Sequence, residues 1–193
     1  GSMSWSPDSQ WLAYGQAASN TFTQLFVFNP TTEKRVTLTS DRTNSLNPQW
    51  SADGKWIYFL SDRNFETKVG SPWGQRQPEP FWEKQMKIYH IPLQKGLISP
   101  FTPKNELKAE EKKSEGPVSV KIDEGLMERV QEVPVTAGNY KNLIVTDKAL
   151  YYHRVGPGPG VYYGGGASNE DEPALMMTPI SEKSEQKVFA DKI

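Results

Sequence analysis

The chain is 193 residues long, carries 22 Lys and Arg against 23 Asp and Glu, and has a formal net charge of −1. With no basic stripe along the sequence, electrostatics argue against nucleic acid and anionic membranes as partners. The sequence contains no cysteine, which excludes thiol catalysis, cysteine-based metal sites and disulfides. No run approaches the roughly 18 apolar residues of a membrane span.

A repeated motif begins close to the N-terminus, after residues 1–3, which resemble a tag remnant and are set aside. Residues 5–14 read WSPDSQWLAY and residues 50–59 read WSADGKWIYF, so the two copies lie 45 residues apart. This spacing fits the roughly 40–45 residues of a four-stranded propeller blade. In each copy, an Asp-Ser or Asp-Gly pair predicts a tight turn between two strands.

Each copy is followed by further expected strands. The first copy is followed by expected strands at residues 24–28 and 34–38. The second is followed by runs at residues 87–93 and 118–122, and a strand over residues 128–135 is expected to extend the same edge. β-Branched and aromatic residues dominate these runs, and none keeps a helical period for more than a turn or two.

A third and weaker copy is centred on the turn at Asp147 and Lys148, between expected strands at residues 142–146 and 149–155. Its Asp147 lies 94 residues after Asp53 of the second copy, about twice one blade. The second unit is therefore expected to contain two insertions, and two more strands are expected in the third unit. The insertions cover residues 65–83 and 98–116, and the strands cover residues 174–178 and 186–190.

The sequence predicts an all-β chain, a partial β-propeller of about three four-stranded antiparallel blades with long loop insertions in the second. Blade 1 is assigned to residues 4–40 with a truncated first strand, blade 2 to residues 41–135 and blade 3 to residues 136–193. Because propellers close with roughly 4–8 blades, the chain is expected to be a fragment. Apolar faces left open at its two ends predict self-association.

Several segments resemble a known family. The Trp-Ser-Pro-Asp motif before an aromatic strand is typical of TolB-like propellers. The second unit and the residues after it are similar to the N-terminal propeller region of bacterial tricorn-type serine proteases, which belong to the carboxyl-terminal-processing class. The segments that carry this resemblance are residues 61–65, 71–81, 88–89, 99–101, 120–130, 133–135 and 138–140.

The resemblance implies that the catalytic domain lies elsewhere in the parent protein, so no catalytic residue is assigned to this chain. It implies as partners the remaining blades and the protease domain of the parent, together with the parent's peptide substrates. The role that it implies is substrate access or presentation, or assembly. A periplasmic or secreted location is suggested by the resemblance alone.

The residues themselves offer little catalytic chemistry. His90 and His153 are the only histidines, both lie in expected strands, and no Gly-x-Ser-x-Gly motif accompanies them. Two isolated histidines without a second ligand motif also make a poor metal site. The glycine runs lack the Gly-Lys-Ser/Thr ending of a phosphate loop. No catalytic, cofactor or metal site is therefore predicted.

One insertion has the composition of a binding loop. Residues 71–82 combine Trp73, Phe81 and Trp82 with Arg76 and three prolines. Aromatic residues and arginine dominate binding hot spots, and proline lowers the entropy lost when a loop becomes ordered. These four residues are candidate contacts for a peptide or partner. The alternative is that the aromatic side chains only hold a long connection against the blade.

Two other functions remain open on the sequence. The chain could be a TolB-like propeller module that binds a partner protein, or the propeller of a prolyl-oligopeptidase-type hydrolase. The sequence of the parent beyond Ile193 separates the three alternatives. A PDZ module with a processing-protease core, further blades alone, or a Gly-x-Ser-x-Gly motif with later Asp and His would each identify one.

Overall fold

The computed structural model describes residues 2–64, 67–68, 81–82, 84–103, 118–156, 172–181 and 183–191. Over these residues the chain is all-β apart from one short 3-10 helix, η1 (Met127–Arg129). Its strands form three four-stranded antiparallel sheets and one two-stranded pair. The predicted fold class, a partial β-propeller, is confirmed. Among the described residues no helix is long and apolar enough to cross a membrane.

The first sheet has the order β1-β2-β3-β4, so each strand pairs with the next along the chain. Met3, one of the residues that resemble a tag remnant, lies in the first strand and pairs with Tyr14 of the second. Alternate residues of the third strand point to opposite faces, which places Leu25 and Val27 together and Phe26 on the other side. The four strands are β1 (Met3–Trp5), β2 (Leu12–Ala17), β3 (Thr23–Asn29) and β4 (Lys34–Thr37).

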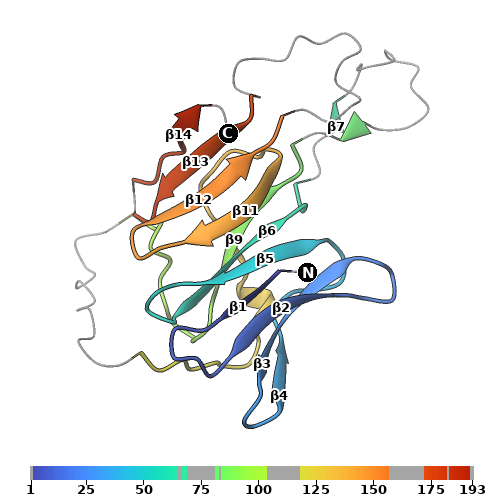
Figure 1. The fold of residues 1–193 in the computed structure, drawn as a ribbon. Coiled ribbons are helices and arrows are strands. Elements are labelled where there is room, and N and C mark those ends of the chain that lie inside the picture. The colour runs from blue at the N-terminus through green and yellow to red at the C-terminus, as the bar shows by residue number, and fades with distance from the viewer. Residues whose placement is uncertain are drawn as a thin grey trace.

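The second sheet has the order β10-β9-β6-β5 and lies in the middle of the molecule (Figure 1). The expected strand at residues 118–122 is wrong, because these residues form no strand. Of the expected strand at 128–135, only Gln131 and Glu132 form a strand, Val133 adds a hydrogen bond to Ile88 at 3.0 Å, and η1 occupies its beginning. The strands are β5 (Ser45–Trp50), β6 (Trp56–Ser61), β9 (Lys87–Pro92) and β10 (Gln131–Glu132).

Residues 118–120 have another role, which explains why they are not a strand. The backbone N–H of Val120 donates to Oδ2 of Asp8 at 2.8 Å, in the turn of the first repeat copy. A Cβ atom on Gly54 would lie 2.8 Å from Val120 Cγ2 and 2.9 Å from Val118 Cγ1. The segment therefore runs across the turns of the first two copies and joins the first sheet to the second.

The third sheet has the order β11-β12-β13-β14. Its first strand has a register shift between Lys141 and Ile144, and Asn142 within it has a φ of 55°. The strand β5 has a matching shift around Asn47, whose φ is 52°. The strands are β11 (Tyr140–Val145), β12 (Ala149–Arg154), β13 (Ala174–Pro179) and β14 (Lys187–Asp191).

The first two repeat copies form the same hydrogen-bonded turn. The hydroxyl of Ser6 donates to the Asp8 carboxylate at 2.6 Å and accepts from the N–H of Trp11 at 2.9 Å. The hydroxyl of Ser51 does the same with Asp53 at 2.5 Å and the N–H of Trp56 at 3.0 Å. The recurrent Trp-Ser-x-Asp sequence is thus explained by a local network that closes the turn.

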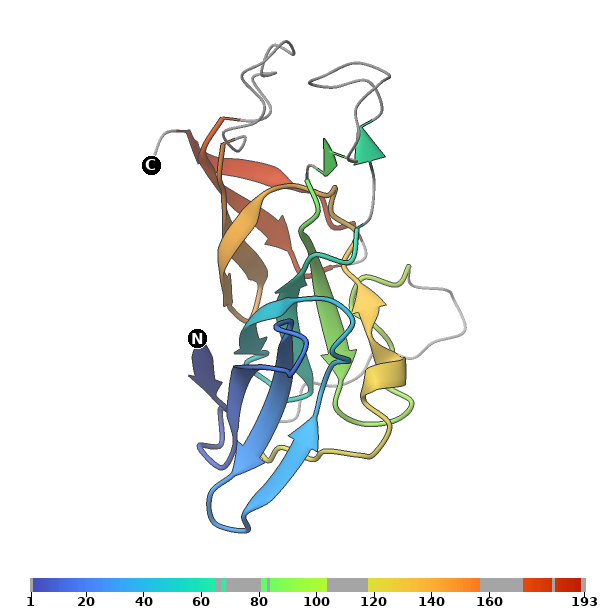
Figure 2. The same ribbon diagram turned by 90° about the vertical axis from the view of Figure 1, so that its right-hand side faces the viewer.

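The three sheets pack face to face, one behind another, as two views show (Figure 1, Figure 2). One core cluster lies between the first and second sheets and a second cluster lies between the second and third. The middle sheet is covered on both faces, and all six residues of β6 are buried. The first and third sheets each contribute only one face to these clusters.

Candidate functional site

The interface between the first and second sheets has a distinct aromatic arrangement. The rings of Phe59 and Tyr89 stack with their centroids 5.9 Å apart and an interplanar angle of 29°. The guanidinium carbon of Arg63 lies 5.4 Å and 5.2 Å from these two ring centroids. Burial lowers the pKa of Arg63, while Tyr89 and Asp62 raise it. This cation–π group is covered by the inner face of the first sheet.

The outer face of the first sheet carries the same arrangement without a cover. The rings of Tyr14 and Phe26 stack with centroids 5.8 Å apart and an angle of 29°. The guanidinium carbon of Arg35 lies 3.8 Å from the Phe26 centroid and 5.9 Å from that of Tyr14. Arg35 also donates to the side-chain oxygen of Gln16 at 2.9 Å. Arg35 is exposed.

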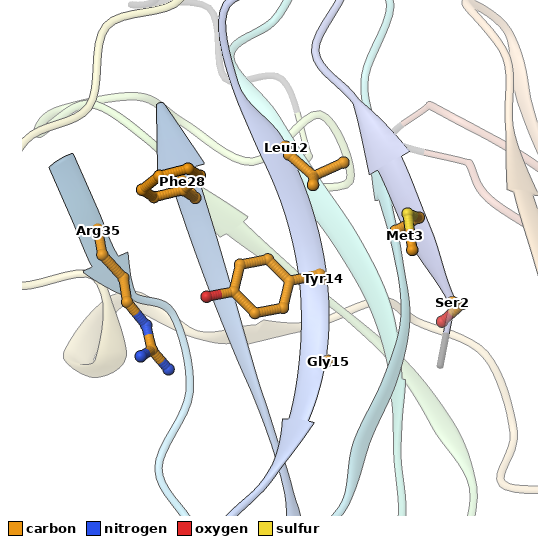
Figure 3. Close-up of a pocket in the computed structure, with 7 residues that line it drawn as sticks. All are labelled: Ser2, Met3, Leu12, Tyr14, Gly15, Phe28 and Arg35. Carbon is orange, nitrogen blue, oxygen red and sulfur yellow. The ribbon is translucent and has the colours of Figure 1, made fainter. Parts of the chain in front are cut away.

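A shallow groove of about 500 Å³ lies on this outer face. Figure 3 shows Met3, Leu12, Tyr14, Phe28 and Arg35 projecting from four neighbouring strands into the same space. Most of these side chains are apolar, and the single charge is the Arg35 guanidinium. The groove therefore suits an apolar partner surface better than a small polar substrate.

Trp5 extends the apolar outer face along β1. Its side chain is 55% exposed, whereas Trp50, at the matching place in the second copy, is 6% exposed. The indole N–H of Trp50 donates to the carbonyl of Ser4 at 3.0 Å, across the interface between the first two sheets. An exposed aromatic side chain beside an apolar groove is typical of an interaction surface.

The outer face of the third sheet is also apolar. Ile144 and Phe189 are 58% and 59% exposed. Tyr151 contacts Phe189 edge-on with ring centroids 5.7 Å apart. Tyr151 pairs with Ile144 on one side and Met177 on the other, so the three side chains share one face. The stack thus ends in an apolar surface on both sides.

The two histidines lie in places that do not favour catalysis. His90 is fully buried on β9, and burial lowers its pKa to about 4, against a small opposing effect of its hydrogen bond to Gln131. Its ring nitrogen Nε2 lies 3.2 Å from the Gln131 oxygen, and Trp56 contacts the ring edge-on. His153 Nδ1 lies 3.2 Å from the Asn142 amide nitrogen. Among the described residues, no three acidic or histidine side chains are placed to bind a metal.

The predicted binding loop is only partly visible. Phe81 and Trp82 form strand β8 (Phe81–Trp82), which pairs with β7 (Thr67–Lys68). Trp73 and Arg76 lie outside the described residues, so the structure does not test whether the four candidates lie together. Their role as peptide or partner contacts stays a prediction.

Sequence reasoning missed the residues that the structure gathers on the outer face of the first sheet. A signal for them was present in β3. Residues 25–28 are apolar without a break, and a strand that faces solvent on one side normally alternates apolar and polar residues. An unbroken apolar run predicts burial on both faces. In this chain a neighbouring sheet buries Leu25 and Val27, whereas Phe26 is 8% exposed beneath Arg35 of its own sheet and Phe28 is half-buried.

Four-stranded antiparallel sheets that stack face to face, each with its strands in chain order from edge to edge, define a segment of a β-propeller. The model of the tricorn protease second β-propeller domain matches residues 1–193, so the chain belongs to this family. The family assignment is to a propeller domain of a protease, as the sequence resemblance predicted.

Solved structures show the same fold. A crystal structure of the tricorn protease superposes with a TM-score of 0.73 at 18% identity, over 98% of this chain and 18% of that one. The structure of a putative TolB from Agrobacterium tumefaciens gives a TM-score of 0.56 at 12% identity, over 97% of this chain and 47% of that one. This chain therefore spans less than a fifth of the tricorn protease and about half of the TolB protein.

Proposed function

We propose that this chain is a non-catalytic propeller segment that serves the assembly of a tricorn-type serine protease. The observation that carries the proposal is the pair of apolar outer faces at the two ends of the sheet stack. A blade buries its faces against neighbouring blades, and a terminal blade without a polar cap leaves such a face open. Each outer face is thus a place for a further sheet.

The residue types on the outer faces support a binding role. Trp5 and Tyr14 with Arg35 lie on one face, and Tyr151 with Phe189 on the other. Tryptophan, tyrosine and arginine are the residues that contribute most to binding hot spots. Contact through such faces would be apolar, which is the character of a permanent interface and not of a transient one.

The non-catalytic part of the proposal is supported by the state of His90. A general base must reach its substrate and have a pKa near the working pH. His90 is fully buried and has a pKa of about 4. A purified sample of the chain is therefore expected to hydrolyse no peptide. Hydrolysis that survives purification to constant specific activity would contradict this part.

A role in substrate access or presentation follows from assembly, because a propeller that is held against a protease restricts the path of peptides. Residues 71–82 are the proposed contact for such peptides. Replacing Trp73 with Ala in the full-length protease is expected to slow the hydrolysis of long peptides more than that of dipeptide-sized substrates. Equal rates for both lengths in the variant and the wild type would remove the loop from the proposal.

The assembly role is tested in the full-length protease that contains this sequence. Trp5→Glu places a carboxylate on the outer face of the first sheet, and Met127→Glu is a matched control because Met127 is 47% exposed on η1, away from both outer faces. Trp5→Glu is expected to lower the protease's melting temperature and its peptidase activity. If Trp5→Glu and Met127→Glu behave alike, the outer face has no role in assembly.

A further inference from the structure

The connection between β9 and β10 contributes to both interfaces of the sheet stack. Two described parts of it matter here, which we call the early arm (residues 93–101) and the late arm (residues 118–126). The arms are joined near their bases, because the N–H of Asp123 donates to the carbonyl of Leu93 at 2.9 Å. The N–H of Lys95 donates in turn to Oδ2 of Asp123 at 2.7 Å. The two arms therefore start from one fixed point at the end of the second sheet.

The late arm is part of the core between the first and second sheets. Val120 and Leu126 are 9% and 2% exposed and belong to the same cluster as Leu25 of β3. Ile122 packs against this cluster from the side. The late arm thus contributes apolar side chains to an interface between two sheets without being a strand of either.

A carboxylate of the first sheet's turn holds the late arm. Oδ1 of Asp8 closes the turn by accepting from the Ser6 hydroxyl and from the N–H of Gln10. Oδ2 accepts the N–H of Val120 at 2.8 Å, from a residue 112 positions later in the chain. Asp53 closes the second turn with the same Oδ1 contacts, but its side chain is exposed. Hydrogen bonds to an ionised carboxylate are stronger than those between neutral groups.

The turn of the second sheet leaves space for the late arm. Gly54 is buried, and a Cβ atom on it would lie within 3 Å of side-chain atoms of both Val118 and Val120. Ser9, at the same place in the first turn, has a similar φ of 57° but is exposed. The glycine is therefore required by the passage of the late arm as well as by its own φ of 67°.

The early arm covers the other interface. Phe101 is 7% exposed and belongs to the core cluster between the second and third sheets. Its ring centroid lies 5.4 Å from that of His90 and 6.4 Å from that of Tyr58. Ile98 of the same arm is 46% exposed. Phe101 is thus the residue that fixes the early arm to the stack.

We propose that the two arms act as a strap that makes the three sheets open as one unit. The late arm, latched by Asp8, holds the first sheet to the second, and the early arm holds the third sheet through Phe101. Stacked repeats otherwise contact only their neighbours, so each sheet could separate from the end of the stack. The strap lies inside the chain, and the proposal is independent of what covers the two outer faces.

The late arm is tested by hydrogen exchange and mass spectrometry on the full-length protease that contains this sequence. In Asp8→Asn the amide oxygen can keep the contacts of the turn, while the amide NH₂ faces the N–H of Val120. Exchange in the late arm and in β2 and β3 is expected to become about tenfold faster or more, with β12 and β13 unchanged. Asp53→Asn is the matched control, because it makes the same change in a turn whose aspartate is exposed, and it is expected to change neither region.

A second pair of variants tests the late arm without a change of charge. Gly54→Ala places a methyl group against Val118 and Val120, and it is expected to reproduce the exchange pattern of Asp8→Asn. Gly96→Ala is the control for backbone strain, because Gly96 also has a positive φ, of 81°. A Cβ atom on Gly96 would meet no atom of the described residues within 4 Å. Gly96→Ala is therefore expected to leave the exchange of the first sheet unchanged.

The early arm is tested by Phe101→Ala, with Ile98→Ala as the control on the same arm. Phe101→Ala is expected to speed exchange in β12 and β13 by about tenfold or more and to leave β2 and β3 unchanged, because Phe101 lies in the second interface alone. Ile98→Ala is expected to change neither sheet, since its side chain is half exposed.

Three results would overturn the strap. Faster exchange in the late arm with an unchanged first sheet would make that arm a passive cover. Equal effects of Asp8→Asn and Asp53→Asn, or of Gly54→Ala and Gly96→Ala, would assign the effect to the turn or to positive φ. An unchanged third sheet in Phe101→Ala would show that the early arm does not hold it. Circular dichroism of each variant confirms that the exchange is measured on folded protein.

Discussion

The two interfaces inside the sheet stack bury different chemistry, although both join one four-stranded sheet to the next. Between the first and second sheets, aliphatic residues meet Ile57, Ile91 and the stacked Phe59–Tyr89 pair. Between the second and third sheets, the core contains a histidine, Trp56, tyrosines and hydrogen-bonded hydroxyls. The first interface depends mainly on packing, with the Trp50 indole N–H donating across it to Ser4 O, whereas the second also buries a histidine and a pair of hydroxyls.

The tyrosine hydroxyls of the second interface are satisfied by specific contacts, whereas Nδ1 of His90 is buried without a hydrogen-bond partner among the described residues. The Tyr152 hydroxyl lies 3.0 Å from the Thr178 hydroxyl, and both residues are fully buried. The Tyr140 hydroxyl donates to the carbonyl of Thr136 at 3.0 Å and accepts from Gln186 at 2.5 Å. Buried polar groups cost little when paired and much when a partner is removed. Substitutions at the two interfaces should therefore differ both in how much unfolding free energy they remove and in the physical cause of the loss.

The largest effect is expected at the apolar interface. Phe59→Ala removes a fully buried ring that stacks on Tyr89 and lies beneath Arg63. A Phe-to-Ala change in a core costs about 3–5 kcal/mol of unfolding free energy, through lost burial and the cavity that remains. Urea denaturation followed by tryptophan fluorescence measures the loss. Phe189→Ala is the matched control, because its side chain is 59% exposed.

A loss below about 1 kcal/mol for Phe59→Ala, or an equal loss for Phe189→Ala, would contradict the view that the first interface depends on close packing. The loss of unfolding free energy is expected to be independent of pH between 5 and 8, because the surroundings of Phe59 contain no group that titrates in this range. This would distinguish the first interface from the second. The Arg63 guanidinium keeps its charge throughout this range.

The second interface should show a pH dependence that the first lacks. Burial lowers the pKa of His90 from 6.5 to about 4, so the folded protein binds its proton only near pH 4 while the unfolded chain binds it near pH 6.5. Between these values the unfolded state holds more protons, and the free energy of unfolding falls as pH falls. The contribution of His90 is complete above about pH 6.5 and decreases by about 3 kcal/mol at pH 4.

Urea denaturation at pH 7.5, 5.5 and 4.5 measures this slope in the wild type and in His90→Leu. The leucine variant replaces the buried imidazole with an apolar side chain of similar size. Because Gln131 is exposed, water can replace the hydrogen bond that it loses. The variant is expected to lose most of the slope in this range. Identical slopes in the two proteins would show that His90 is already accessible to protons in the folded state.

The sequence predicted most strands and turns of the blades, but it did not predict which faces of the sheets pack against each other. Asp53 and Gly54 predicted the turn because their chemistry is local, and the hydrogen bonds of Ser51 confirm it. The expected strand at residues 118–122 was wrong because its partner, Asp8, is more than 100 residues away and no local signal indicates it. The third copy was found despite lacking the Ser-x-Asp turn, since its strand pattern is retained.

The candidate site was also predicted only in part. The exposed aromatic residues of the outer faces lie in strands that the sequence predicted, but exposure depends on which sheets are neighbours, and that is a property of the tertiary structure. Trp73, Arg76, Phe81 and Trp82 were chosen by composition alone, and composition does not place side chains together. Their proposed role therefore depends on experiment.

The smallest effect is expected from a single hydroxyl at the second interface. Tyr152→Phe leaves the Thr178 hydroxyl buried without its partner, at a cost of about 1–2 kcal/mol in unfolding free energy. Thr178→Val removes this partner from the Tyr152 hydroxyl, which keeps its interaction with the Gln186 side chain, so the cost is expected to be smaller. The double variant removes both polar groups and is expected to lose less than the sum of the single variants, because no unpaired group remains. Additive losses would mean that each hydroxyl finds another partner, and the second interface would then depend on packing as the first does.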